Sequence, residues 1–80
     1  MTIVIRDKMF KPPIAHAKPA QRVWFLNNDD LTHTITFEDP SVRSLTLNPN
    51  DHYNIAFEKP GEFKYHSDGM TGTVLVEVES

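Results

Sequence analysis

The 80-residue chain contains no cysteine. Disulfide bonds, thiolate metal ligands, cysteine nucleophiles and iron–sulfur clusters are therefore excluded. The chain also has no apolar run near the roughly 18 residues that a membrane span requires, and no signal-peptide core follows Met1. We therefore expect a soluble protein that carries no membrane span and no export signal in this sequence.

The chain also lacks an excess of basic residues. Eight Lys and Arg residues against eleven Asp and Glu residues give a formal charge of −3. A charge of this size and sign does not hold a protein on nucleic acid or anionic lipid by counterion release. We therefore expect neither as a main partner. Because 80 residues with 39% hydrophobic content supply one thin core, we also expect a single domain over residues 1–80.

Periodic patterns that indicate helices are missing. Short runs in which apolar and polar residues alternate recur about every ten residues instead, and Pro, Gly, Asn and Asp separate them. This pattern is typical of an all-β Greek-key β-sandwich with about eight short strands. The predicted strands cover residues 2–6, 15–17, 21–27, 33–38, 44–47, 52–58, 62–67 and 71–79.

Alternation along each strand also predicts which side chains face the core. His33 begins an inward row that continues through Ile35 and Phe37. Ser67 ends another inward row, while its neighbour His66 points outward. We therefore expect His33 and Ser67 to lie beside each other at one pole of the sandwich. The same rule points these further side chains inward: Tyr53, Ile55, Phe57, Phe63, Tyr65, Val74, Val76 and Val78.

Several short motifs follow one another in a familiar order. They are Phe10-Lys11-Pro12, the run VWFLNND over 23–29, LNPN over 47–50, KPGEFKY over 59–65 and MTGTVLV over 70–76. In this order and spacing they resemble the cupredoxins, the family of plastocyanin, amicyanin and pseudoazurin, over nearly the whole chain. The resemblance implies the same Greek-key sandwich. It also implies that His33 stands at the position of the family's first copper-binding histidine.

The sequence departs from the family at the copper site. The family's Y-x-C-x-x-H-x-x-M supplies a thiolate, the second histidine and the axial methionine, whereas this chain reads YHSDGM over 65–70. Ser67 stands at the cysteine position, and the shorter loop lacks the second histidine. A blue copper centre needs a short bond from copper to a cysteine thiolate. The resemblance therefore implies a degenerate site.

Three residues remain as candidate metal ligands, namely His33, Met70 and His66. His33 either ligates through a ring nitrogen or is a half-buried histidine bonded to a backbone carbonyl. Met70 either offers a soft thioether suited to Cu(I) or fills the end of the core. His66 either completes a mixed N₂S set or lies on the surface. Asp68 either adds a carboxylate for Cu(II) or is an ordinary residue of an Asp-Gly turn.

These residues lead to two hypotheses. The first is a copper-binding cupredoxin variant whose non-thiolate His/Met site takes Cu(I) or Cu(II) and serves copper binding, delivery or slow electron transfer. The alternative is a metal-free cupredoxin-fold module with an interaction or structural role. We do not expect an enzyme, since nothing beyond His33 suggests a general acid or base.

The resemblance also bears on partners and location. Besides the copper ion, we expect a redox or copper-handling protein at the pole that contains His33 and Met70, or self-association there. The habit of the family is a periplasmic or other extracytoplasmic location, and the sequence is also compatible with the cytoplasm.

Overall fold

The chain forms short strands wherever apolar and polar side chains alternate. The computed structural model describes residues 1–78, in which every regular element is a strand. The nine strands are β1 (Thr2–Arg6), β2 (Met9–Lys11), β3 (Ile14–Ala17), β4 (Arg22–Asn27), β5 (His33–Phe37), β6 (Leu45–Leu47), β7 (His52–Ala56), β8 (Gly61–Ser67) and β9 (Met70–Val76).

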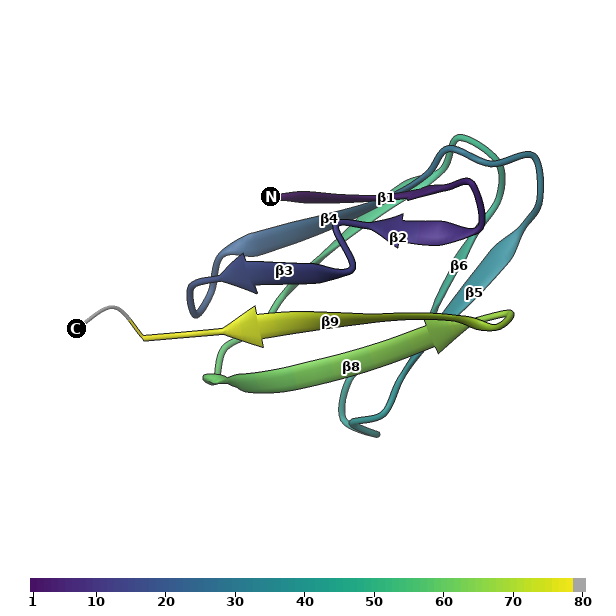
Figure 1. Ribbon diagram of the computed structural model, residues 1–80. Coiled ribbons are helices and arrows are strands. Elements are labelled where there is room, and N and C mark those ends of the chain that lie inside the picture. The colour runs from purple at the N-terminus through teal and green to yellow at the C-terminus, as the bar shows by residue number, and fades with distance from the viewer. Residues whose placement is uncertain (79–80) are drawn as a thin grey trace.

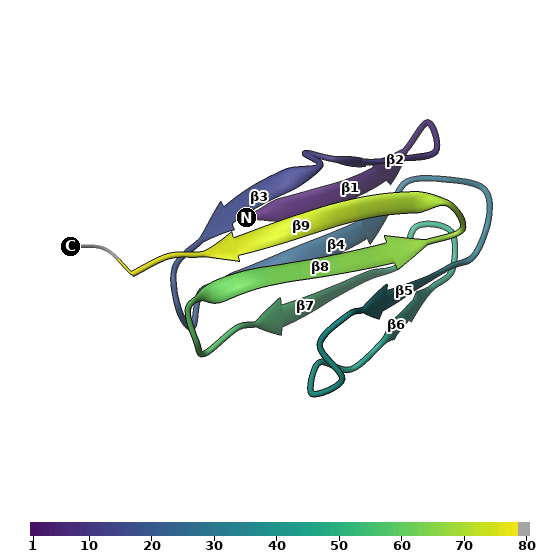
Figure 2. The ribbon, with the colours of Figure 1, turned by 60° about the horizontal axis from the view of Figure 1, so that its bottom comes forward.

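The strands form two sheets that pack face to face as a sandwich (Figures 1 and 2). One sheet has the order β2-β1-β4-β7, and the other has the order β3-β9-β8-β5-β6. Two strand pairs are parallel, β1 with β4 and β3 with β9, and the remaining pairs are antiparallel. The predicted β-sandwich is therefore confirmed. Within residues 1–78, no helix has the length and apolar character needed to cross a membrane.

Tyr65 lies at the centre of the core between the two sheets. Its ring is 1% exposed and lies edge-on to Phe10 and Phe25, with ring centroids 4.7 and 5.3 Å away. Such edge-to-face contacts add to the free energy gained by burial. Burial also raises the pKa of the Tyr65 hydroxyl far above its ordinary value. The phenol is therefore neutral at any physiological pH and serves as packing.

The structure differs from the sequence prediction at one short strand and at two side chains. Alternation does not reveal β2, a strand of only three residues that a tight turn joins to β1. It places Tyr53 inside, but Tyr53 is 49% exposed, because β7 is an edge strand and Tyr53 lines an open hollow there. It also places Val78 inside, but Val78 is 66% exposed, because β9 ends at Val76. Residue 79, the end of the predicted strand, lies outside the described residues.

Gly72 allows the Tyr65 ring to lie flat against β9. The two residues pair across β8 and β9, and a Cβ atom at Gly72 would overlap the end of the Tyr65 ring. We expect Gly72→Ala to lower the free energy of unfolding by about 1–3 kcal/mol, since the enclosed ring has little room to shift. Thr71→Ala, an exposed change next to it, should cost about 0.5 kcal/mol or less. Urea denaturation measures both, and equal losses would contradict this role of Gly72.

Candidate metal centre

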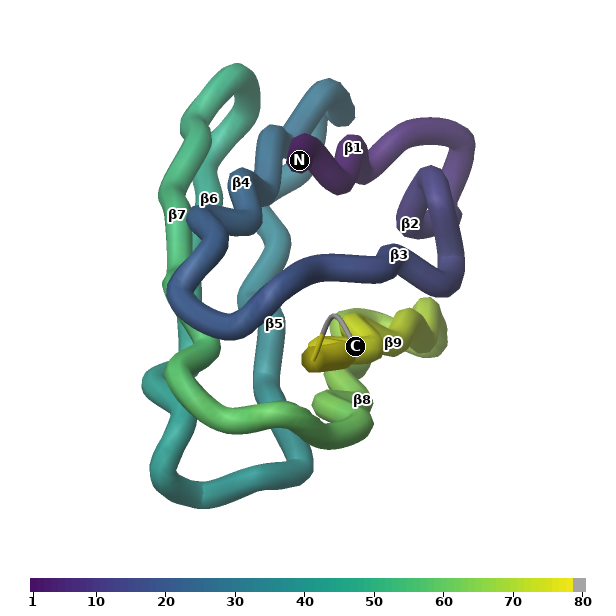
Figure 3. The backbone as a smooth tube through the Cα atoms, turned by 90° about the vertical axis from the view of Figure 1, so that its left-hand side faces the viewer, coloured from purple at the N-terminus to yellow at the C-terminus, as the bar shows by residue number. Residues whose placement is uncertain are grey.

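Several connections meet at the end of the sandwich where β5 begins, which we call the His33 pole. The turn at 7–8, the loop at 28–32, the turn at 48–51 and the turn at 68–69 lie at this end (Figure 1), which is the end away from the viewer in Figure 3. Backbone hydrogen bonds join the start of the 28–32 loop to the end of β1, from Asn28 N–H to the Ile5 carbonyl, and join the end of β4 to the turn at 48–51, from Asn27 N–H to the Asp51 carbonyl. The start of the 28–32 loop is therefore fixed to two neighbouring parts of the pole.

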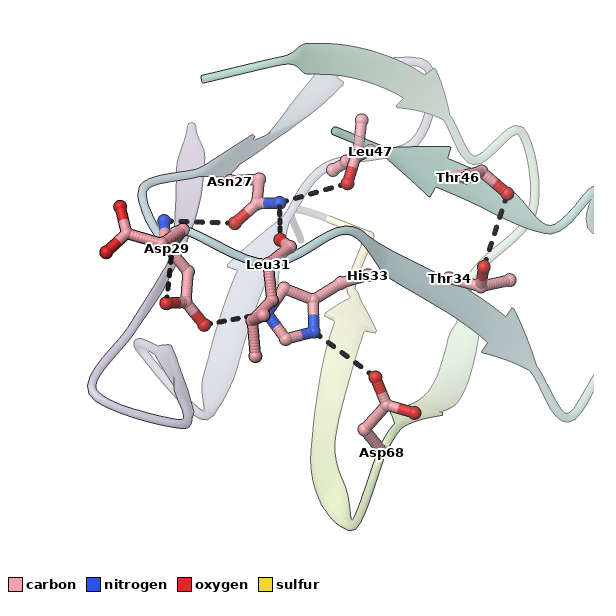
Figure 4. A network of polar contacts seen from close by, with 9 residues as sticks. Asn27, Asp29, Leu31, His33, Thr34, Thr46, Leu47 and Asp68 are labelled. Carbon is pink, nitrogen blue, oxygen red and sulfur yellow. Dashed lines mark hydrogen bonds and ion pairs between the residues drawn. The ribbon is translucent and has the colours of Figure 1, made fainter. Parts of the chain in front are cut away.

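The side chain of Asn27 fixes the β4–β5 loop by hydrogen bonds. Its side chain is fully buried, and its amide nitrogen donates to the carbonyls of Leu31 (2.7 Å) and Leu47 (3.0 Å) (Figure 4). Its amide oxygen accepts the backbone N–H of Asp29 at 3.0 Å. These three hydrogen bonds fix one conformation of the β4–β5 loop, because any other conformation would leave the buried Asn27 amide without partners.

His33 is the first residue of β5 and points into the end of the core. It is 4% exposed, and its Nε2 lies 2.8 Å from the Asp29 carboxylate. Because an ionised carboxylate only accepts hydrogen bonds, Nε2 is the nitrogen that carries a proton. This bond is the main reason that the pKa of Asp29 lies below its ordinary value of 3.8, and the backbone N–H of Asp30 adds to the effect. Asp29 therefore stays charged at neutral pH and fixes the orientation of the ring.

The second ring nitrogen of His33, Nδ1, is buried, points toward the turn at 68–69 and has no hydrogen-bond partner within residues 1–78 (Figure 4). Among the residues the structure describes, three buried side-chain atoms have no hydrogen-bond partner: Nδ1 of His33 and Oγ of Ser67 at the pole, and the hydroxyl of Tyr65 in the core. The carboxylate of Asp68 lies 3.5 Å from Nδ1, which is longer than a hydrogen bond. Unpartnered buried polar atoms are rare in folded proteins, and a bound ion is one kind of partner that satisfies them.

The other two candidate ligands, Met70 and His66, lie on opposite sides of the sheet. Met70 pairs with Ser67 across the β8–β9 turn, is 7% exposed and belongs to the core. His66 lies opposite Thr36 on β5 and is exposed. Because side chains alternate along β8, His66 and Ser67 lie on opposite faces. His33, Ser67 and Met70 thus share the inner side of the pole, and His66 lies on the outer surface of the sheet.

The β8–β9 turn consists of only Asp68 and Gly69. Both have positive φ angles, 44° and 83°, which is the backbone of the tightest hairpin turns. The side chain of Asp68 is 73% exposed, yet its carboxylate points toward His33 (Figure 4). The Asp-Gly pair in the sequence indicates a turn and gives no sign of this direction.

The donor atoms at the pole do not fit a thiolate copper centre, since the chain has no cysteine. Within residues 1–78, no group of three or more His, Cys, Asp or Glu side chains could hold a metal ion. The pole instead offers an imidazole nitrogen, a thioether and a nearby carboxylate. The first two donors suit copper, and they would leave coordination positions open.

The arrangement of the two sheets is that of the cupredoxins. Among solved structures, a reduced amicyanin mutant matches with a TM-score of 0.87 at 21% identity, covering 96% of this chain and 81% of amicyanin. A Cu(I) amicyanin mutant matches with a TM-score of 0.86, 21% identity and the same coverage. The purple cupredoxin from Nitrosopumilus maritimus matches with a TM-score of 0.82 at 22% identity, covering 95% of this chain and 98% of that one.

Comparison with protein-family models and with curated proteins gives no match. The likeness to amicyanin and to the purple cupredoxin therefore shows the fold, which is the cupredoxin fold expected from the sequence motifs.

The hydrogen bond between Asp29 and His33 gives a prediction about pH. A carboxyl group whose pKa is lowered by folding stabilises the native state above its unfolded pKa, and this contribution is lost as pH falls through the folded pKa. We expect Asp29→Asn to be less stable than the wild type at pH 7, with the difference closing below about pH 4, near the ordinary aspartate pKa. Urea denaturation from pH 7 to pH 3 measures this.

Asp30→Asn is the matched control, because it removes the same charge from an exposed neighbour. It should leave stability nearly unchanged at pH 7. A stability difference for Asp29→Asn that is the same at every pH would contradict a charged Asp29 acting on His33.

Proposed function

We propose that the protein binds copper at the His33 pole through His33 and Met70, and that it stores or hands over the ion or transfers electrons slowly. The observation that carries this proposal is Nδ1 of His33, a buried and unpartnered nitrogen on a ring that Asp29 orients. A histidine whose other nitrogen bonds a carboxylate is a common form of metal-binding histidine.

The chemistry of the donors supports copper. Imidazole nitrogen binds both copper oxidation states, and the soft thioether of Met70 favours Cu(I) over zinc or magnesium. A bound copper ion would supply one-electron redox chemistry. The chain's own residues have separate tasks: Asp29 orients the His33 ring and keeps the proton on Nε2, and the core around Met70 keeps water from the inner side of the pole.

The expected kinetics follow from the missing thiolate. Without a cysteine ligand the site lacks the covalent copper–sulfur bond of blue copper centres, so we expect electron transfer to be slow and copper delivery to be the better-suited task. Open coordination positions would let a partner protein take the ion at this pole. The solved structures with this fold include Cu(I) forms of amicyanin. By the same resemblance we propose a non-enzymatic role outside the cytoplasm.

One observation favours the alternative, a metal-free interaction module. No three His, Cys, Asp or Glu side chains converge as metal ligands in residues 1–78. In that case the unpartnered atoms at the pole would remain from a lost metal site, and the protein would act by binding another protein. Copper binding decides between the two.

Copper titration of the metal-free protein tests the proposal. We expect one Cu(I) or Cu(II) per chain, no intense blue absorption, and at least a tenfold loss of affinity in His33→Ala, since one imidazole ligand is removed. Met70→Leu keeps the core volume and should weaken Cu(I) more than Cu(II). Competition with a chelator measures each affinity.

His66→Ala and His16→Ala are the controls, because both histidines are exposed and lie away from the inner side of the pole. Each should bind copper like the wild type. Binding that survives His33→Ala but is lost in either control would overturn the proposed site, and weak, non-stoichiometric binding in all variants would favour the metal-free module.

A further inference from the structure

The turn between β8 and β9 brings a carboxylate to the free nitrogen of His33. We propose that Asp68 is itself a metal ligand, and that it makes the His33 pole a site for Cu(II) with one anionic oxygen donor. This inference rests on the proposed function, since it takes Nδ1 of His33 as the first ligand.

The distance between the two donor atoms supports shared coordination. Oδ2 of Asp68 lies 3.5 Å from Nδ1 of His33. This separation is too long for a good hydrogen bond, which spans about 2.7–3.2 Å. Two donors that each lie about 2.0–2.2 Å from one first-row metal ion are roughly 3.3–3.8 Å apart at tetrahedral to trigonal angles. The observed pair therefore has the spacing of two ligands that share an ion.

Turn geometry explains the residue type at position 68 but not the direction of its side chain. A left-handed residue before Gly69 is required, and Asn or Gly would meet that requirement as well as Asp. The carboxylate is 73% exposed, so water competes for it. An ion held between the carboxylate and the ring would give both groups a partner.

A second, independent observation lies next to this pair. Ser67 precedes Asp68 in the chain, is 2% exposed, and its hydroxyl has no partner within residues 1–78. If the pairing of Thr36 with His66 continues along the strands, Ser67 lies opposite Ile35 on the same inner face as His33. An ion or its bound water at the pole would satisfy this hydroxyl too.

The added oxygen donor changes which oxidation state the site prefers. Carboxylate is a hard, anionic ligand and interacts more favourably with Cu(II) than with the softer, singly charged Cu(I). The soft thioether of Met70 favours Cu(I) instead. We therefore expect Asp68 to raise the affinity for Cu(II) selectively and to lower the reduction potential of the bound copper.

Asp68→Asn tests this directly, because Asn keeps the size of the side chain and fits the turn. We expect at least a tenfold weaker affinity for Cu(II), a change of less than about threefold for Cu(I), and an altered electron paramagnetic resonance spectrum of the Cu(II) form. Asp30→Asn, which removes the same charge from the β4–β5 loop, should change none of these. Asp68→Gly, which also suits the turn, should repeat the result of Asp68→Asn.

The outcomes separate this inference from the proposed function. If Asp68→Asn binds both oxidation states like the wild type while His33→Ala does not bind, Asp68 is only a turn residue and the inference fails. Equal losses for Cu(II) and Cu(I) would also overturn it, since they indicate a general effect on the pole. If His33→Ala binds copper like the wild type, the proposed function fails and this inference fails with it. A selective loss of Cu(II) in both Asp68 variants supports it.

Discussion

The buried side-chain amide of Asn27 joins three parts of the chain at the His33 pole. Through two carbonyls and one N–H it links the end of β4, the β4–β5 loop and the end of β6. Asp29 lies within that loop, and its carboxylate sets the orientation of His33. The free nitrogen at the His33 pole is thus the last step of a chain of contacts that begins at Asn27. Loss of the amide would release the loop and, with it, the ring.

The sequence predicts much of this arrangement because side chains alternate along strands. His33, Phe37 and Ser67 are buried as expected, since each lies on the apolar side of its strand. Alternation assigns a face but does not say whether a neighbouring sheet covers it, which is why it misplaces Tyr53 on the edge strand β7. Asn27 follows the same alternation as Val23 and Phe25, so a polar residue at an inward position is a signal of a buried network.

The orientation of the His33 ring and the direction of the Asp68 carboxylate could not be predicted from alternation along the strands. The bond from His33 to Asp29 depends on the conformation of a five-residue loop at 28–32, and no local pattern fixes that conformation. The direction of the Asp68 carboxylate depends on a two-residue turn with positive φ angles. A longer loop at the same place would carry the side chain elsewhere. Details at this level follow from tertiary contacts and not from residue type.

The core that maintains the fold is separate from the candidate site. Tyr65 and the phenylalanines around it pack in the middle of the sandwich, whereas the donor atoms lie at one end. A chain can therefore keep the cupredoxin fold while the chemistry of the pole changes, because fold and function are set by different residues. At the pole of this protein, the imidazole of His33 is oriented by Asp29 and lies near the carboxylate of Asp68, and the chain has no cysteine.

In the proposed function, folding prepares Nδ1 of His33 as a metal donor. Long-range ¹H–¹⁵N nuclear magnetic resonance of the metal-free protein, repeated after one equivalent of Cu(I), tests it most directly. If His33 is the copper ligand, its ring proton lies on Nε2 in the metal-free protein, and among the histidine nitrogens Cu(I) causes the largest shift at Nδ1 of His33. A proton on Nδ1 in the metal-free protein, or a Cu(I)-induced shift only at other histidines, would contradict it.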